Sequence, residues 1–118
     1  AQSAARHRSP QQYLATIMIV RVWRARAPVA NPSAYPRYFI DHVLPQLQRL
    51  DGFAGATLLR QHRAHDIEYV VETRWTSMDP IRVFAGANVE RAVVEPEAQA
   101  ALIDYDQRVS HYEIVHEV

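Results

Sequence analysis

The sequence predicts an α+β domain whose elements follow the order strand, helix, strand, strand, helix, strand. Three observations support this class: a β-branched run at 17–23, apolar residues at helical spacing over 35–50, and two strand-like runs within 53–75 that are separated by a short polar turn. A strand pair placed between two helical stretches is typical of an antiparallel sheet that is covered by helices on one face.

The first strand and the first helix have the clearest signals. The run at 17–23, Ile-Met-Ile-Val-Arg-Val-Trp, is rich in residues that favour strands. Asn31 is expected to cap the following helix, with Pro32 at its first position. Pro45 lies inside this helix and is expected to bend it, because proline has no N–H to donate. The apolar face of this helix is formed by Tyr35, Phe39, Val43, Leu47 and Leu50.

A hairpin follows the first helix, which ends at the Asp51-Gly52 pair. Strands are expected at 53–61 and 67–75, joined by the short polar segment 62–66.

The second half of the chain predicts shorter elements. Ser77 or Asp79 is expected to cap a second helix that carries Pro80 in its first turn and ends at Gly86. A third helical segment is expected from Pro96 to about residue 103, and a last strand at about 108–115.

The predicted arrangement is ferredoxin-like, with four antiparallel strands and helices on one face. In the first strand we expect Met18, Val20 and Val22 to face the helices, which leaves Arg21 and Trp23 on the open face. That face then mixes charged and apolar side chains, a composition that suits an interface between two copies of the chain better than open water.

Composition excludes several classes of protein. The chain has 118 residues, 13 basic and 13 acidic side chains and no cysteine. Nucleic acid is therefore not an expected partner, and disulfides, thiolate metal sites and a cysteine nucleophile are excluded. No apolar run approaches the roughly 20 residues of a membrane span, so no membrane partner is expected and the cytoplasm is the expected location.

Several motifs resemble those of one family. They are the start of the first strand at 18–23, the helix ending Val43-Leu44-Pro45, the break at 51–53, the run Trp75-x-Ser77-x-x-x-Ile81-x-x-Phe84 and the tail at 105–113. Together they are similar to the antibiotic biosynthesis monooxygenase (ABM) domains. The resemblance implies a dimeric α/β barrel formed by residues 17–118, with a pocket between each sheet and its own helices, and it leaves 1–16 as an N-terminal extension.

The resemblance implies three alternative functions. The first is a cofactor-independent monooxygenase that acts on an aromatic or polyketide-like small molecule. The second is a non-catalytic domain that binds a small ligand or only dimerises. The third and weakest is a haem-degrading monooxygenase, because that branch uses an Asn on the first strand and a His on a helix after the Trp, whereas here the first strand has no Asn and the segment 77–103 has no His. No cofactor is expected for the first two.

Candidate catalytic residues are His42 and Trp75. In the family a Trp at the end of this strand lines the pocket, and His42 borders the apolar face of the first helix, where it is a candidate base. The alternatives are an ordinary imidazole at the helix edge for His42 and a core aromatic under the second helix for Trp75.

Other residues are expected to line the pocket. Arg21 is a candidate cation for a substrate anion, and its alternative is an ion pair with Glu72 or Glu113 on neighbouring strands. The remaining candidates are Tyr35, Tyr38, Phe39, Tyr69, Phe84 and His111. No metal site is expected, because the histidines around the turn, His62 and His65, lack the spacing of a dedicated site.

Overall fold

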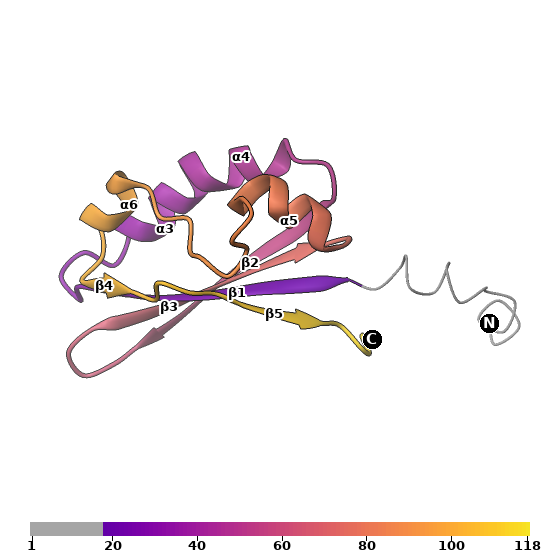
Figure 1. The fold of residues 1–118 in the computed structure, drawn as a ribbon. Coiled ribbons are helices and arrows are strands. Elements are labelled where there is room, and N and C mark those ends of the chain that lie inside the picture. Colours follow the sequence, from indigo (N-terminus) through magenta and orange to yellow (C-terminus); the bar gives the residue numbers. More distant parts are fainter. Residues whose placement is uncertain (1–17) are drawn as a thin grey trace, which may run out of the picture.

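Helices cover one face of a five-stranded antiparallel sheet (Figure 1). The computed structural model describes residues 18–118, so the expected N-terminal extension 1–16 and the first residue of the predicted first strand lie outside the described part. The sheet has the order β2-β3-β1, and both β4 and β5 pair with the remaining edge of β1. The predicted fold class, a ferredoxin-like sheet with helices on one side, is confirmed.

The long strands agree with the sequence pattern. They are β1 (Ile19–Ala27), β2 (Phe53–His62) and β3 (Ile67–Trp75), and β2 and β3 form the predicted hairpin. The last predicted strand is instead two short ones, β4 (Asp104–Tyr105) and β5 (Ser110–Glu113). The count of four becomes five because this segment pairs with the two ends of β1 separately.

The first helix is interrupted where the sequence carries a proline. It consists of α3 (Ala34–Tyr38), the π-helical turn η1 (Phe39–Val43) and α4 (Leu44–Gln48). Pro45 has no N–H for the carbonyl of Asp41, and the N–H of Leu44 reaches back five residues to the carbonyl of Phe39. The N-cap is Ser33 rather than the predicted Asn31, which lies in the preceding turn.

The two shorter helices begin where the sequence indicates. Ser77 is the N-cap of α5 (Met78–Ala85), and Gly86, with a φ of 86°, ends it. Pro96 opens α6 (Pro96–Ala100), which ends before the predicted residue 103. Gly52 makes the turn between α4 and β2 with a φ of 89°, and a Cβ there would lie 2.3 Å from Cγ of Pro80.

The strand register corrects the expected orientation of β1. Arg21 pairs with Thr73 and Trp23 pairs with Val71, both on the face of β3 that is buried under the helices. Because directly paired residues share a face, Arg21 and Trp23 also point toward the helices, and Val20 and Val22 point away from them. The expectation that Arg21 and Trp23 occupy the open face is wrong.

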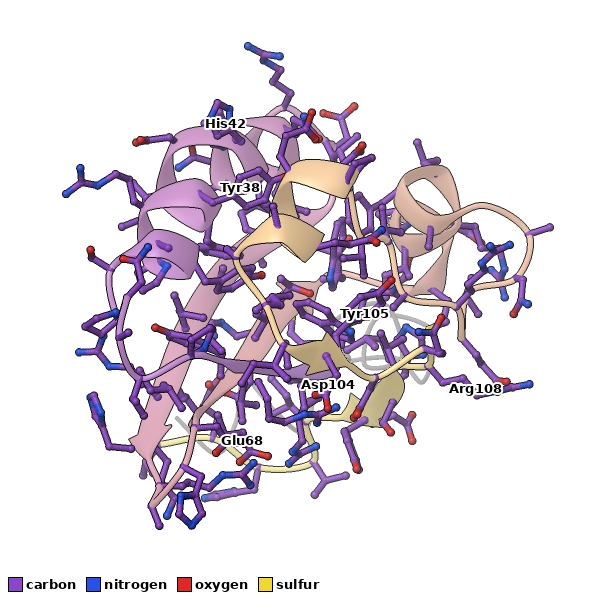
Figure 2. The ribbon with its side chains drawn as sticks, turned by 90° about the vertical axis from the view of Figure 1, so that its left-hand side faces the viewer. Tyr38, His42, Glu68, Asp104, Tyr105 and Arg108 are labelled. Carbon is purple, nitrogen blue, oxygen red and sulfur yellow. The ribbon has the colours of Figure 1, made fainter. Side chains whose placement is uncertain are left out.

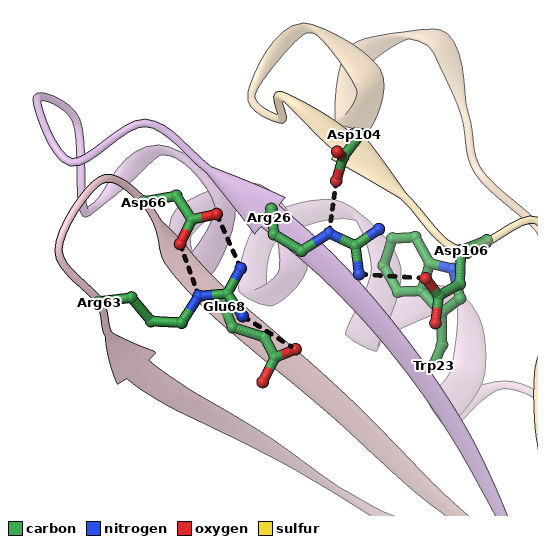
Figure 3. A network of polar contacts seen from close by, with 7 residues as sticks. All are labelled: Trp23, Arg26, Arg63, Asp66, Glu68, Asp104 and Asp106. Atoms are coloured by element: carbon green, nitrogen blue, oxygen red, sulfur yellow. Dashed lines mark hydrogen bonds and ion pairs between the residues drawn. The ribbon is translucent and has the colours of Figure 1, made fainter.

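Polar contacts fasten β4 to the end of β1 (Figure 3). Arg26 forms ion pairs with Asp104 and Asp106, the second at 3.0 Å, and the indole N–H of Trp23 donates to the carbonyl of Asp106 at 2.7 Å. Asp66 in the hairpin turn is held by Arg63 at 2.6 Å. The network fixes the position of the Trp23 ring on the inner side of the sheet.

The core has two apolar clusters. One lies between α3, η1 and the middle of the sheet, and the other lies under α5 around Leu47, Trp75 and Ile81. These three side chains are almost completely excluded from water. They join the first helix, the end of β3 and α5 into one packing unit.

We expect Ile81→Ala to lower the free energy of unfolding by about 2–5 kcal/mol, because it leaves a cavity between α5 and Trp75. Val83→Ala is the matched control on the same helix, because Val83 is 75% exposed and is expected to change stability by less than about 0.5 kcal/mol. Urea titration measures both. Equal losses in the two variants would contradict the assignment of Ile81 to the core.

Candidate functional site

A cavity of about 70 Å³ lies between the helices and the inner face of the sheet. A cavity that encloses benzene has a volume of about 150 Å³, so this one encloses only part of an aromatic ring. Its walls are mostly apolar and aromatic, as expected for a small-molecule site. The lining residues are Arg21, Trp23, Tyr35, Tyr38, Phe39, Val43, Leu47, Val71, Thr73, Phe84, Val93, Val94, Glu95, Ala98 and Val109.

Arg21 is the one basic residue of this lining, and it is 5% exposed. Its Nη1 donates to the carbonyl oxygen of Val89 at 2.6 Å, and its Nη2 donates to that of Arg91 at 2.9 Å. Its guanidinium carbon also lies 5.7 Å from the centre of the Phe84 ring. The side chain therefore holds the segment after α5 against the sheet while it lines the cavity.

The charge of Arg21 is not matched by an acid. Among residues 18–118 the guanidinium forms no ion pair, so the predicted alternative of a pair with Glu72 or Glu113 is wrong. Glu72 pairs with Val22 in the register and so lies on the opposite face of the sheet. Burial lowers the pKa of Arg21 to about 10, which still leaves it charged at neutral pH.

His111 on β5 stands beside Arg21. The two residues are paired across the strands, and Nη1 of Arg21 lies 3.0 Å from Nε2 of His111. Because a guanidinium only donates, Nε2 is the acceptor and Nδ1 carries the proton of the neutral ring. Burial first, and then the charge of Arg21, lowers the pKa of His111 below its ordinary value of 6.5, although Glu90 acts in the opposite direction.

Tyrosines and one carboxylate complete the helix side of the cavity. Tyr35 is buried against Tyr69, with ring centres 5.3 Å apart, and burial raises the pKa of its phenol well above the ordinary range. Tyr38 is half-buried, and its pKa is raised by burial and then by Glu95 and Glu97. Glu95 is exposed, so it marks the solvent side of the cavity, whereas Arg21 lies in the interior.

The structure brings together five of the predicted pocket residues: Arg21, Tyr35, Tyr38, Phe39 and Phe84 all line the cavity. Tyr69 and His111 lie one layer behind it. Tyr69 is fully buried and donates its hydroxyl to the carbonyl of Pro32 at 2.8 Å. His111 reaches the cavity only through Arg21.

The two candidate catalytic residues lie outside the cavity lining. Trp75 is buried between Phe53 and Phe84 and donates its indole N–H to the hydroxyl of Thr73 at 2.8 Å, so it occupies the core position described by its alternative interpretation. His42 is exposed, and its ring lies 5.3 Å from that of Tyr38 (Figure 2). A chemical role for either residue stays a prediction.

Sequence reasoning missed most of the sheet side of the cavity. The sequence of β1 contains a signal that Trp23 faces the helices. The strand continues as Arg24-Ala25-Arg26-Ala27, so the apolar Ala25 and Ala27 share a face with Trp23 and Arg21, and the charged residues of this continuation lie on the other face. The residues between α5 and α6 carried no periodic signal. The lining residues not predicted are Trp23, Val43, Leu47, Val71, Thr73, Val93, Val94, Glu95, Ala98 and Val109.

The described residues form neither a metal site nor a membrane-spanning helix. Among residues 18–118 no group of three or more His, Asp or Glu side chains is placed to hold a metal ion. In the same part of the chain, no helix is both long enough and apolar enough to cross a bilayer.

Comparison with solved structures places the fold. A haem-degrading protein of Mycobacterium tuberculosis matches with a TM-score of 0.61 and 18% identity, over 87% of this chain and 97% of that one. A putative antibiotic biosynthesis monooxygenase of Bacillus cereus has a TM-score of 0.59 and 17% identity, over 86% and 97%. SnoaB, a cofactor-independent oxygenase of Streptomyces nogalater, has a TM-score of 0.54 and 22% identity, over 86% and 95%.

The chain is thus a ferredoxin-like α+β domain, and it has a cavity between its sheet and its helices. More particularly, the chain has the fold of the ABM monooxygenases, which confirms the predicted resemblance at the level of the fold. No family model matches the sequence, and no curated protein matches it.

The contact between Arg21 and His111 predicts a pH dependence of stability. With its pKa lowered on folding, His111 binds fewer protons in the folded than in the unfolded chain, so the free energy of unfolding falls as the pH drops from about 6.5 through the lowered pKa. We expect His111→Gln, which can still accept from Arg21, to flatten this decline. Urea titrations between about pH 5 and 8 measure it.

His62→Gln, which removes an exposed imidazole at the hairpin, is the control for that series. A decline in His111→Gln as steep as in the wild type would show that the imidazole of His111 does not couple to folding.

Proposed function

We propose that the chain is a cofactor-independent monooxygenase that acts on an aromatic small molecule. The observation that carries the proposal is the cavity lined by aromatic side chains. Its wall contains the buried guanidinium of Arg21, which has no ion-pair partner among residues 18–118. Its support from the comparisons is the shared fold with SnoaB and with the monooxygenase of Bacillus cereus.

The proposed reaction requires few functional groups from the protein. An electron-rich phenol that has lost a proton can itself pass an electron to dioxygen, and when the oxygen then binds at a CH₂ carbon of the same ring system, the resulting hydroperoxide loses water to leave a quinone. In this balance one CH₂ group and O₂ give one C=O group and H₂O. The site must supply a dry cavity and a cation that stabilises the substrate anion, and Arg21 is suited to the second task.

The cavity limits the substrate. Its volume of about 70 Å³ encloses only part of one ring, so the rest of an aromatic or polyketide-like substrate would extend past half-buried Tyr38 toward the solvent side. The base that removes the phenol proton is a prediction with two candidates, Glu95 in the lining and His42 beyond Tyr38.

Haem does not fit this cavity. No residue that lines it is a His, Cys or Met, and the pKa values of the two phenols in the lining, Tyr35 and Tyr38, are raised, which disfavours the phenolate form that would bind the iron axially. Haem degradation is therefore not proposed, despite the shared fold with a haem-degrading protein.

One observation favours a second candidate function, a binding domain without turnover. The lining holds no imidazole, and its one carboxylate, Glu95, is exposed at the solvent side. Ligand binding without oxygen consumption would identify this alternative.

We also propose that two copies pair through the sheet face that is turned away from the helices. This face carries Val20, Val22, Val70 and Leu59 in its middle and charged residues around them, and Leu59 is 44% exposed. Apolar residues surrounded by charge are typical of interfaces between chains.

A cytoplasmic location stays a prediction.

Oxygen uptake with 1,8-dihydroxyanthrone, whose CH₂ group would become the second carbonyl of a quinone, tests the enzymatic proposal. We expect a protein-dependent rate above that of buffer, and we expect Arg21→Gln to lower it roughly tenfold or more, because the substrate anion loses its cation. Arg37→Gln on α3 is the matched control, because Arg37 is exposed and does not line the cavity.

In the same assay, His42→Ala and Trp75→Phe test the roles that the sequence indicated, and unchanged rates would remove both residues from the mechanism. The proposal itself fails if 1,8-dihydroxyanthrone gives no protein-dependent uptake, or if Arg21→Gln is as fast as the wild type.

Sedimentation equilibrium tests the pairing. We expect the wild type to have twice the mass of the chain and Leu59→Glu to shift it toward a monomer, because a carboxylate would be buried in the interface. Val83→Glu, on the exposed side of α5, is expected to remain a dimer. A monomeric wild type would refute this part of the proposal.

A further inference from the structure

We propose that the cavity binds an aromatic carboxylate, with the carboxylate on Arg21 and the ring among the aromatic side chains of the lining. The inference deepens the proposed function, and rests on it, by naming a carboxylate as the anionic group of the aromatic substrate that Arg21 holds. It follows from the hydrogen bonds of Arg21, from its burial and from the distribution of charge around the cavity.

The first step is the uncompensated charge. Arg21 is 5% exposed and has no carboxylate partner within residues 18–118. Neutral acceptors, two backbone carbonyls and the imidazole of His111, satisfy hydrogen bonds but leave the positive charge in a region of low dielectric constant. A buried charge in proteins is normally paired, and the cavity is the place where a ligand can supply the missing anion.

The second step is the number of donors. A guanidinium has five N–H donors, and three of those of Arg21 are used by Val89, Arg91 and His111. Two remain for a ligand, and the two carbonyls hold the plane of the group in place. A fixed fork of N–H groups is the geometry that a carboxylate recognises.

The third step is the surroundings of the cation. Trp23, Phe39 and Phe84 line the same cavity, so a ring attached to the carboxylate would be enclosed by aromatic side chains. The one acidic residue of the lining, Glu95, is exposed, where solvent and salt screen its repulsion of a ligand anion. The cavity is therefore positive in its interior and apolar around that charge.

A purely structural role for Arg21 makes a different prediction. If the side chain only clamps the segment at 89–91 onto the sheet, the cavity has no reason to prefer an anion over a neutral molecule of the same shape. Benzoate and benzamide are such a pair, because they share the ring and the planar head group and differ in charge. The comparison in the wild type needs no variant.

The experiment is a titration followed by the indole N–H resonances of the full chain, which has two tryptophans. Trp23 lines the cavity and Trp75 does not, so Trp23 should shift the more. We expect benzoate to bind roughly tenfold or more tightly than benzamide, and acetate to bind more weakly than benzoate. Arg21→Gln should remove the preference, whereas Arg37→Gln, on the exposed side of α3, should retain it.

Three outcomes would overturn the inference: equal affinities for benzoate and benzamide in the wild type, no binding of either probe, or a benzoate preference that persists in a folded Arg21→Gln protein. If Arg21→Gln does not fold, Arg21→Lys keeps the charge without the fork, and an undiminished benzoate affinity there would refute recognition by two N–H groups. Benzoate binding without oxygen uptake would refute the proposed turnover alone.

Discussion

The register of β1 against β3 determines which side chains of β1 reach the cavity. Because side chains alternate along a strand, a shift of one residue would exchange Arg21 and Trp23 for Val20 and Val22. The observed register pairs Arg21 with Thr73, and the separate pairing of β1 with β5 aligns Arg21 with His111. A charged residue is thereby placed among the apolar side chains under the helices, and the chemistry of the cavity follows from that placement.

The buried arginine has a structural cost that the surrounding segments offset. Its hydrogen bonds reach the backbone of the segment between α5 and α6, which has little regular structure of its own and forms one wall of the cavity. Arg21 therefore holds this wall of the cavity in place and also places a positive charge in the cavity interior. Stability and ligand binding are expected to be linked through Arg21, because a ligand that binds the folded chain stabilises it.

The interruption of the first helix has a similar local origin. Pro45 cannot donate to Asp41, and the π-helical turn that precedes it carries Phe39 and Val43, both of which line the cavity. The turn also leaves His42 on the exposed side of the helix. A single proline thus influences which residues of this helix face the sheet, and π-helical turns of this kind are frequent at functional sites.

The sequence was sufficient to predict the order of the elements up to the last strand, the hairpin, a helix start at Ser77 or Asp79, another at Pro96, and the resemblance to the ABM fold, because these depend on local signals such as strand propensity, proline position and helical spacing. It also indicated five of the residues that line the cavity. It misplaced the faces of β1, since both sets of alternating residues in 18–23 contain large apolar side chains and only the continuation to Ala27 distinguishes them.

Three features became visible only in the folded chain: Arg21 is buried with no acidic partner among residues 18–118, His111 lies beside it, and Trp75 and His42 lie outside the cavity lining. These facts depend on the pairing of β1 with two other strands and on the path of the segment after α5. Residues 21, 89, 91 and 111 are far apart in the chain, and no local pattern brings them together.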